Sequence, residues 1–184
     1  MHEAIFDAVL VELREQGYAG LTMDGVAARA QTGKATLYRR WPSKLELIVA
    51  ALDFAMPKVR VPDDRGDLRG ELLDVLHQLA EEMASVSGEA ARGLIAELVR
   101  SPALARAIRP FLADSVIAPT LEVLRRAAVR GEIPVSALTP RYASIGTDLL
   151  RQHALVNGNP VPEEVITEIV DGILLPLMRG LVTT

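Results

Sequence analysis

Apolar residues recur at helical spacing along most of the chain. Ile5, Val9, Leu10 and Leu13 share one face of a first helix, which we expect to end just before Gly17 because glycine commonly follows the last residue of a helix. Three short helices are predicted next, over about residues 22–30, 34–41 and 43–56. Glycine and proline residues set the breaks between these helices.

The run from Pro57 to Gly66 has two prolines, a glycine and mixed charges but no apolar period, which is typical of a linker. We therefore expect a small domain over residues 1–56, a linker over 57–66 and a larger domain over 67–184. The later helices are expected over about residues 67–86, 89–100, from Pro102 onward, 111–130, 140–156 and 162–181. Pro119 should kink one of these helices, and Pro176 should bend the last.

No stretch shows the sustained alternation of a β-strand, so the sequence predicts an all-α fold of about nine helices. Hydrophobic residues make up 49% of the 184 residues and charged residues 24%, which is typical of a globular protein. The absence of a long apolar run or signal peptide favours a cytoplasmic protein with no membrane partner. With no cysteine and three scattered histidines, no metal or cofactor is expected.

Positive charge is concentrated near the N-terminus. Five basic residues and no acidic residue lie between Gly25 and Leu45, so this stretch carries a charge of +5. The rest of the chain has 15 basic and 24 acidic residues, which gives the net charge of −4. Charge alone leaves two interpretations open, a solvated helix face and a surface that binds nucleic acid.

The helices at 22–30 and 34–41 are separated by a turn of three or four residues, as in a helix-turn-helix motif. Such a second helix fits the major groove of DNA, where cations neutralise phosphates and polar groups reach base edges. The segment GYAGLTMDGVAARAQTGKATLYRRWPSKLELI, residues 17–48, resembles the DNA-binding domain of tetracycline-repressor-like (TetR-family) regulators. The resemblance implies a ligand-responsive homodimer, most often a repressor, that binds a palindromic operator.

The resemblance also implies which residues meet double-stranded DNA. Thr22 would cap the second helix and touch a phosphate, while Lys44 would bind a phosphate at the start of the fourth helix. The recognition helix and its preceding turn would contribute Thr32, Lys34, Thr36, Tyr38 and Arg39. Arg40 is left open between a DNA contact and a solvated charge.

Leu37 and Trp41, four residues apart, are expected to face the core beneath the recognition helix. Members of the family usually have glycine or another small residue at the position of Gln31. We therefore expect a positive φ at Gln31, at a cost of about 1 kcal/mol.

In the family, the larger domain binds a small-molecule effector that changes the spacing of the two recognition helices. His77 and Glu97 are the candidate effector residues here, because a pocket needs a few polar groups in an apolar wall. The alternative for each is an ordinary polar residue of the core or surface.

The last two helices are apolar over wide arcs, which favours a helix pair that meets its twofold copy in a dimer. The expected interface residues are Leu149, Leu150, Ile166, Ile169, Val170, Ile173 and Leu177. The alternative is an ordinary core within one chain.

An enzyme and a ligand carrier are the other two function classes for a helical chain of this size. An enzyme is not expected, because no nucleophile–histidine–acid set and no glycine-rich phosphate loop is present. A ligand carrier with a vestigial DNA-binding domain is the remaining alternative, and it would bind a small molecule but no DNA.

Overall fold

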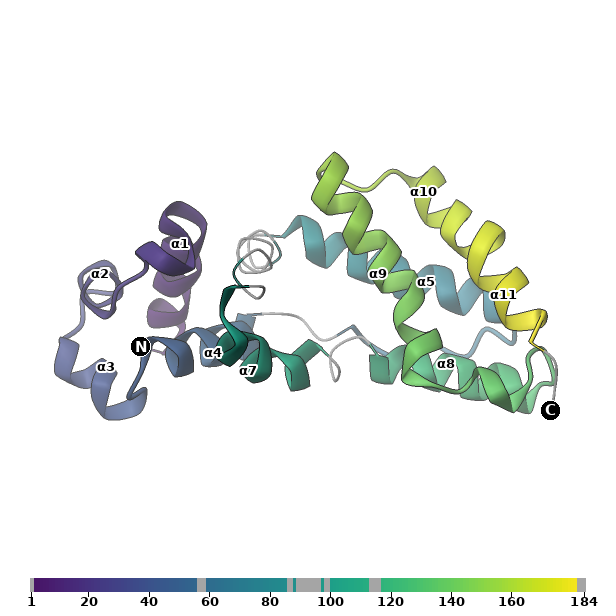
Figure 1. Cartoon of the computed structure of the whole chain (residues 1–184), viewed down its shortest axis with the longest axis horizontal. Coiled ribbons are helices and arrows are strands. Elements are labelled where there is room, and N and C mark those ends of the chain that lie inside the picture. Colours follow the sequence, from purple (N-terminus) through teal and green to yellow (C-terminus); the bar gives the residue numbers. More distant parts are fainter. Residues whose placement is uncertain are drawn as a thin grey trace. The chain divides into compact units, whose positions relative to one another are not determined.

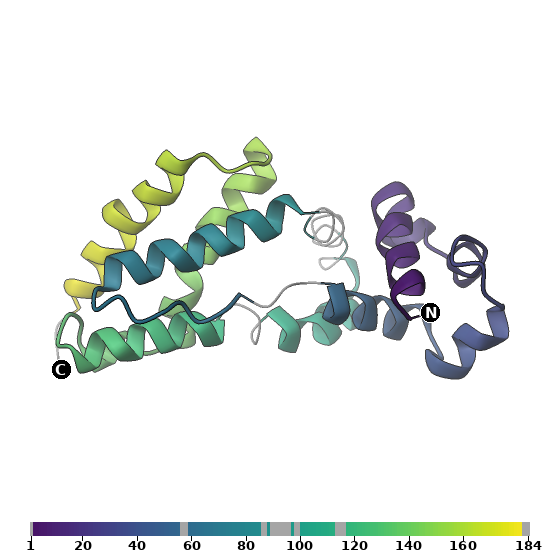
Figure 2. The same ribbon diagram turned by 180° about the vertical axis from the view of Figure 1, so that it is seen from behind.

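The computed structural model describes residues 2–55, 59–85, 88, 97, 100–112 and 117–181. Every regular element in these ranges is helical, which confirms the all-α prediction (Figures 1 and 2). None of the described helices is both long and apolar enough to span a membrane.

The chain divides into two compact units. The first is formed by Met1–Pro57 and Ser85–Phe111, and the second by Lys58–Ala84 and Leu112–Thr184. The described residues between Ser85 and Phe111 therefore group with the first unit. The helix predicted over 89–100 lies largely outside the described residues.

The first unit begins with four helices in the predicted order. They are α1 (His2–Gly20), α2 (Met23–Arg29), α3 (Lys34–Arg40) and α4 (Lys44–Ala55). Helix α1 packs against α4 and α2, and α2 packs against α3. Gly17 has a φ of +66° and interrupts α1 at the predicted position. Thr22 caps α2 as predicted, because its hydroxyl accepts a hydrogen bond of 3.0 Å from the N–H of Gly25.

Apolar stripes of these helices make the core of the first unit. Its most deeply buried side chains include Ile5, Val9, Leu21, Val26, Leu37, Leu47 and Ile48. Helix α7 (Pro102–Leu112) begins as predicted, with Pro102 in its first turn and the hydroxyl of Ser101 accepting a 3.3 Å hydrogen bond from the N–H of Leu104.

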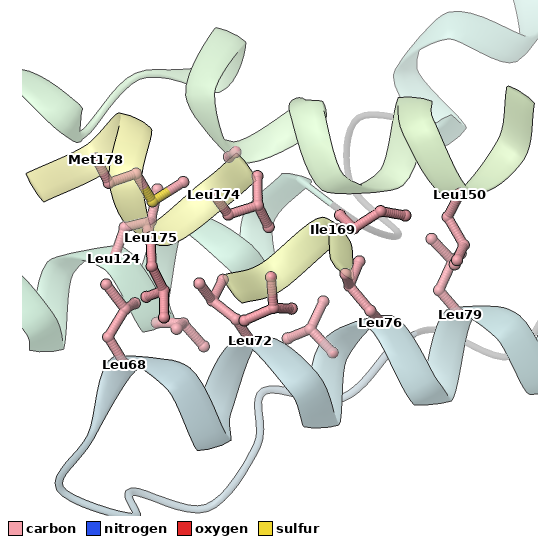
Figure 3. Packing of buried hydrophobic residues seen from close by; sticks show 14 of the residues in the cluster. Leu68, Leu72, Leu76, Leu79, Leu124, Leu150, Ile169, Leu174, Leu175 and Met178 are labelled. Carbon is pink, nitrogen blue, oxygen red and sulfur yellow. The ribbon is translucent and has the colours of Figure 1, made fainter. Parts of the chain in front are cut away.

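The second unit is built around α5 (Leu68–Ala84). The other elements are α8 (Ala118–Val129), η2 (Val135–Ala137), α9 (Pro140–Asn157), α10 (Glu163–Glu168), η3 (Ile169–Leu174) and α11 (Leu175–Arg179). Helix α5 contacts α8, α9, α10 and η3. Figure 3 shows leucines spaced along one side of α5, from Leu68 to Leu79, pointing toward apolar residues of α9, η3 and α11.

Two predicted helices differ from expectation in detail. Helix α8 begins at Ala118 with Pro119 in its first turn, where the missing N–H has no intrahelical partner in any case. The segment predicted as one helix over 162–181 contains a π-helical turn, η3, between α10 and α11. Pro176 lies in the first turn of α11, directly after η3.

The predicted linker is packed against the second unit over residues 59–66, which we call the strap. Val59 and Pro62 are buried. The side-chain amide of Gln78 accepts from the N–H of Arg60 (2.9 Å) and donates to the Arg60 carbonyl (3.2 Å). Arg126 donates to the Pro62 carbonyl (2.9 Å). The strap is therefore part of a folded unit rather than a free connection.

A buried ion cluster lies beside the strap. The carboxylate of Glu71, which is completely buried, lies 3.0 Å from the guanidinium groups of both Arg126 and Arg130. Arg130 also pairs with Asp64 of the strap (3.1 Å) and with Glu132 (2.7 Å). Burial raises the pKa of Glu71, and the two arginines act in the opposite direction.

Candidate nucleic-acid interface

Helices α2 and α3 are joined by residues 30–33, which gives the short connection that a helix-turn-helix motif requires. Gln31 has a φ of +50°, which confirms the positive φ expected from the sequence. The turn reverses the direction of the chain between α2 and α3. Because α2 packs against α3, the orientation of α3 and of its exposed side chains is fixed.

The outer side of α3 carries residues that suit DNA. Lys34, Ala35, Tyr38 and Arg39 are exposed, and the Tyr38 side chain is 44% exposed. The ammonium group of Lys34 lies 5.8 Å from the centre of the Tyr38 ring. A cation, a phenol and a guanidinium on one short helix can bind phosphates and base edges.

The inner side of α3 belongs to the core, as predicted. Leu37 is completely buried. Trp41 is half-buried and packs edge-on against Phe6 of α1, with 5.4 Å between ring centres. Both side chains therefore position the recognition helix rather than face DNA.

The basic residues differ in how free they are. Arg29 pairs with Glu12 (3.0 Å) and Glu15 (2.6 Å), so its charge is used between α2 and α1. Lys34 pairs with Asp24 (2.7 Å). In the described part of the chain, no ion pair engages Arg39, nor the neighbouring Arg40, which is also exposed.

Lys44 lies at the start of α4 and is half-buried. Its ammonium group donates a 2.8 Å hydrogen bond to the carbonyl of Tyr18 and sits 4.6 Å from the centre of the Tyr18 ring. Helix geometry is broken at Gly17, so this lysine satisfies a backbone carbonyl at the interrupted end of α1. The sequence could not reveal this contact, because the two residues are far apart in the chain.

Three predicted hydroxyl groups remain. Thr22, at the start of α2, is exposed, and its hydroxyl hydrogen stays available because the oxygen only accepts within the cap. Thr32 and Thr36 are half-buried at the turn and in the first half of α3. Asp24 was missed at the sequence level, since nothing in its local pattern marked it as the partner of Lys34.

Two family descriptions match nearly all of this architecture. "Bacterial regulatory proteins, tetR family" matches residues 5–51, and "Tetracyclin repressor-like, C-terminal domain" matches residues 62–173. The chain belongs to the TetR family. TetR-family regulators bind DNA, so this chain is a DNA-binding transcriptional regulator and not an enzyme.

Curated TetR-family relatives cover most of the chain. An HTH-type transcriptional regulator of Mycobacterium tuberculosis (strain H37Rv) is 34% identical over 89% of this chain and 81% of its own length. The DNA-binding transcriptional repressor TetR of Mycobacteroides abscessus is also 34% identical, over 96% of this chain and 93% of its own.

Solved structures share the fold at lower identity. A TetR-family transcriptional regulator from Rhodococcus sp. superposes with a TM-score of 0.74 at 22% identity, covering 97% of this chain and 98% of its own. GusR of Salmonella enterica superposes with a TM-score of 0.78 at 19% identity, covering 97% and 95%.

The two effector candidates lie in different units. His77 on α5 lines an open, polar groove of about 440 Å³ beside the strap, and its Nε2 lies 2.7 Å from a carboxylate oxygen of Glu163. Glu97 is half-buried in the first unit, where its carbonyl accepts a 2.8 Å hydrogen bond from the N–H of Ser101. Their role at an effector site remains a prediction.

A smaller cavity of about 10 Å³ lies inside the second unit. It is lined by residues of α5, α8, α9, η3 and α11, including Leu76, Thr120, Tyr142, Thr147 and Met178. Thr147 is only 4% exposed, and its hydroxyl has no hydrogen-bond partner within the described residues. The sequence pattern identifies Thr147 as a polar residue on an apolar helix face. It does not show that the Thr147 hydroxyl has no hydrogen-bond partner.

The predicted dimer residues separate into two groups. Leu150, Ile166, Ile169 and Val170 are buried in the core of the second unit. Leu149 is partly buried against that core, while Ile173 and Leu177 are 38% and 37% exposed. Only the second group has side-chain surface that a second copy could cover.

Proposed function

We propose that this TetR-family chain is a homodimeric repressor that binds a palindromic operator and releases it when a small molecule binds the second unit. The observation that carries the proposal is the exposed side of α3, where Lys34, Tyr38 and Arg39 face outward above a fully buried Leu37. The name of the relative in Mycobacteroides abscessus, a repressor, supports the direction of regulation. Such a regulator acts where the chromosome lies, in the cytoplasm.

At the operator, Lys34 and Arg39 contact phosphates or base edges, and the Tyr38 hydroxyl donates to a phosphate. Thr22 at the start of α2, Thr32 in the turn and Thr36 in α3 add hydroxyl donors. Lys44 keeps two N–H groups for a phosphate beside its bond to Tyr18.

A dimer is supported by the exposed apolar residues of the last helix. Ile173 and Leu177 are four residues apart, with the small Gly172 and the exposed Pro176 beside them. Exposed apolar side chains grouped in this way are typical of a surface that another chain covers. Two recognition helices about 34–36 Å apart would then read two half-sites.

An effector site is supported by the small cavity around Thr147. Its apolar wall with one unpartnered hydroxyl suits a small, mainly apolar molecule that carries one hydrogen-bonding group. The cavity as it stands holds about one water molecule, so such a ligand would have to displace flexible wall residues such as Met178.

The first experiment is selection of bound sequences from a random duplex library at two salt concentrations. We expect one palindrome, and a log–log salt slope near −7 if each subunit neutralises about four phosphates. The double variant Lys34→Ala, Arg39→Ala should select no sequence from the library. The control Arg179→Ala, which removes an exposed charge of the second unit, should select the same sequence as wild type. Failure of the wild type to select any sequence at low salt would favour the ligand-carrier alternative.

A further inference from the structure

Gln31 occupies a backbone position that normally belongs to glycine. Its φ of +50° is the one positive φ at a non-glycine residue in the described ranges. The N–H of Gln31 donates to the Ala28 carbonyl (3.2 Å), and the N–H of Thr32 donates to the Ala27 carbonyl (2.9 Å). These two bonds are the Schellman arrangement that ends a helix, in which the left-handed residue is usually glycine.

The side chain of Gln31 makes no contribution to the fold that would offset its backbone strain. A Cβ is strained in the left-handed region, whereas glycine is not. The Gln31 side chain is exposed, and its carboxamide makes no hydrogen bond to another described residue. A strained residue whose side chain has no local contact is a reason to look for a contact with another molecule.

Gln31 lies close to the surface of α3 that is proposed to bind DNA. It lies three residues before Lys34, and the intervening Gly33 is exposed, so its surface continues into the exposed side of α3. The carboxamide offers two N–H donors and one acceptor, while DNA presents phosphate oxygens and the acceptor edges of bases. We propose that Gln31 donates a hydrogen bond from its side-chain amide to DNA, next to the recognition helix.

This proposal rests on DNA binding by the chain but not on a dimer or an effector. Its test compares wild type with Gln31→Gly and Gln31→Ala, using a duplex that the wild type selects from a random library. We expect Gln31→Gly to raise the midpoint of thermal unfolding by about 2–4 °C, because backbone strain is removed. The same variant should bind the duplex about 2- to 10-fold more weakly, because a hydrogen bond is lost.

Gln31→Ala is the matched control for backbone flexibility. Alanine keeps the strained Cβ and removes the carboxamide, so we expect it to bind as weakly as Gln31→Gly without the gain in thermal stability. Because glutamine is neutral, both variants should keep the wild-type salt slope, whereas Lys34→Ala should reduce it by about 1 for each subunit bound.

Several outcomes separate the possibilities. Tight binding by either Gln31 variant would overturn the proposal, and a changed salt slope would show that the effect is electrostatic rather than a hydrogen bond. A loss that is equal for all duplex sequences identifies a phosphate as the acceptor, and a loss confined to one or two base pairs identifies a base edge. If the wild type itself selects no duplex, the proposed regulator function fails first.

Discussion

The ammonium group of Lys34, on α3, lies 2.7 Å from one carboxylate oxygen of Asp24, on α2, and 2.8 Å from the other. Asp24 raises the pKa of Lys34 above its usual value, chiefly through this hydrogen bond. Because the pKa is raised, the stabilising pair is present below pH 10.5 and is lost only as the pH rises through the higher folded value. Lys34 is therefore charged when the protein meets DNA, but its charge is already paired with that of Asp24.

We therefore expect Asp24→Asn to bind DNA of any sequence several-fold more tightly and to steepen the salt slope by up to about 0.9 for each subunit bound. Fluorescence anisotropy with a random-sequence duplex at a series of salt concentrations measures both quantities. Asp63→Asn, the same charge change at an exposed position of the second unit, should have a much smaller effect. Equal affinities for Asp24→Asn and wild type would contradict a restraining role for the ion pair.

Ile173→Asp and Leu177→Asp should shift the protein from dimer to monomer, because a charge would be buried in the proposed interface. Both side chains are more than a third exposed within one chain, so the unfolding midpoint of the monomer should change little. Light scattering after size exclusion at micromolar concentration gives the mass. Val135→Asp, at a residue that is 72% exposed in η2, is the control. Dimers that persist in both interface variants would place the interface elsewhere.

Thr147→Val should stabilise the protein by about 1 kcal/mol, since it removes a buried hydroxyl that has no partner. Thr120 lines the same cavity and is similarly buried, but it does have an interaction partner, so Thr120→Val should be destabilising. Urea unfolding of the three proteins measures the difference. A loss of stability in Thr147→Val would mean that the hydroxyl is already satisfied in solution.

Glu71→Leu should destabilise the second unit by about 3–5 kcal/mol, because Arg126 and Arg130 would lose their buried counter-ion. Replacing all three, as Glu71→Leu with Arg126→Met and Arg130→Met, should recover much of the loss by removing the unpaired charges. Denaturant unfolding of the single and triple variants tests this. If the triple variant is no more stable than the single one, then the other bonds of the two arginines, from Arg126 to the strap and from Arg130 to Asp64 and Glu132, matter more than the pairing with Glu71.

Asp171 in η3 forms a two-pronged pair with Arg69 of α5, with distances of 2.7 and 2.8 Å. Hydrogen bonding to Arg69 lowers the pKa of Asp171 below 3.8. A lowered carboxyl pKa gives stability that is complete above pH 3.8 and is lost as the pH falls through the folded value. The stability difference between wild type and Asp171→Asn should therefore be constant from pH 5 to 7 and shrink below pH 4 in urea unfolding. A difference that persists at pH 2 would point to packing instead.

Much of the first unit could be predicted because its signals are local. The cap at Thr22, the break at Gly17 and the positive φ at Gln31 each depend on a few neighbouring residues. The partners of Lys34 and Lys44 could not be predicted, because they come from other helices and depend on packing. Glu97 is a different case. A polar residue among apolar ones looks the same in the sequence whether its side chain lines a pocket or lies at the surface.

In the last helix, the number of residues per turn changes at η3, and a regular helical spacing does not predict which residues after it are buried. With regular α-helical spacing, Ile166, Val170, Ile173 and Leu177 would share one face. In the structure, Leu174 and Met178 are buried instead, while Ile173 and Leu177 turn outward. The wider turn of η3 lies at this change.

The π-helical turn also bears on how this helix tolerates changes in length. A π turn closes with an i→i+5 bond, so it holds one residue more than the α-helical turn that could replace it. Deletion of Gly172, an exposed residue inside η3, would leave the flanking α10 and α11 to join as one continuous helix. Deletion of a single residue is therefore expected to be accommodated here, at a point where most helices would lose their alignment with the core.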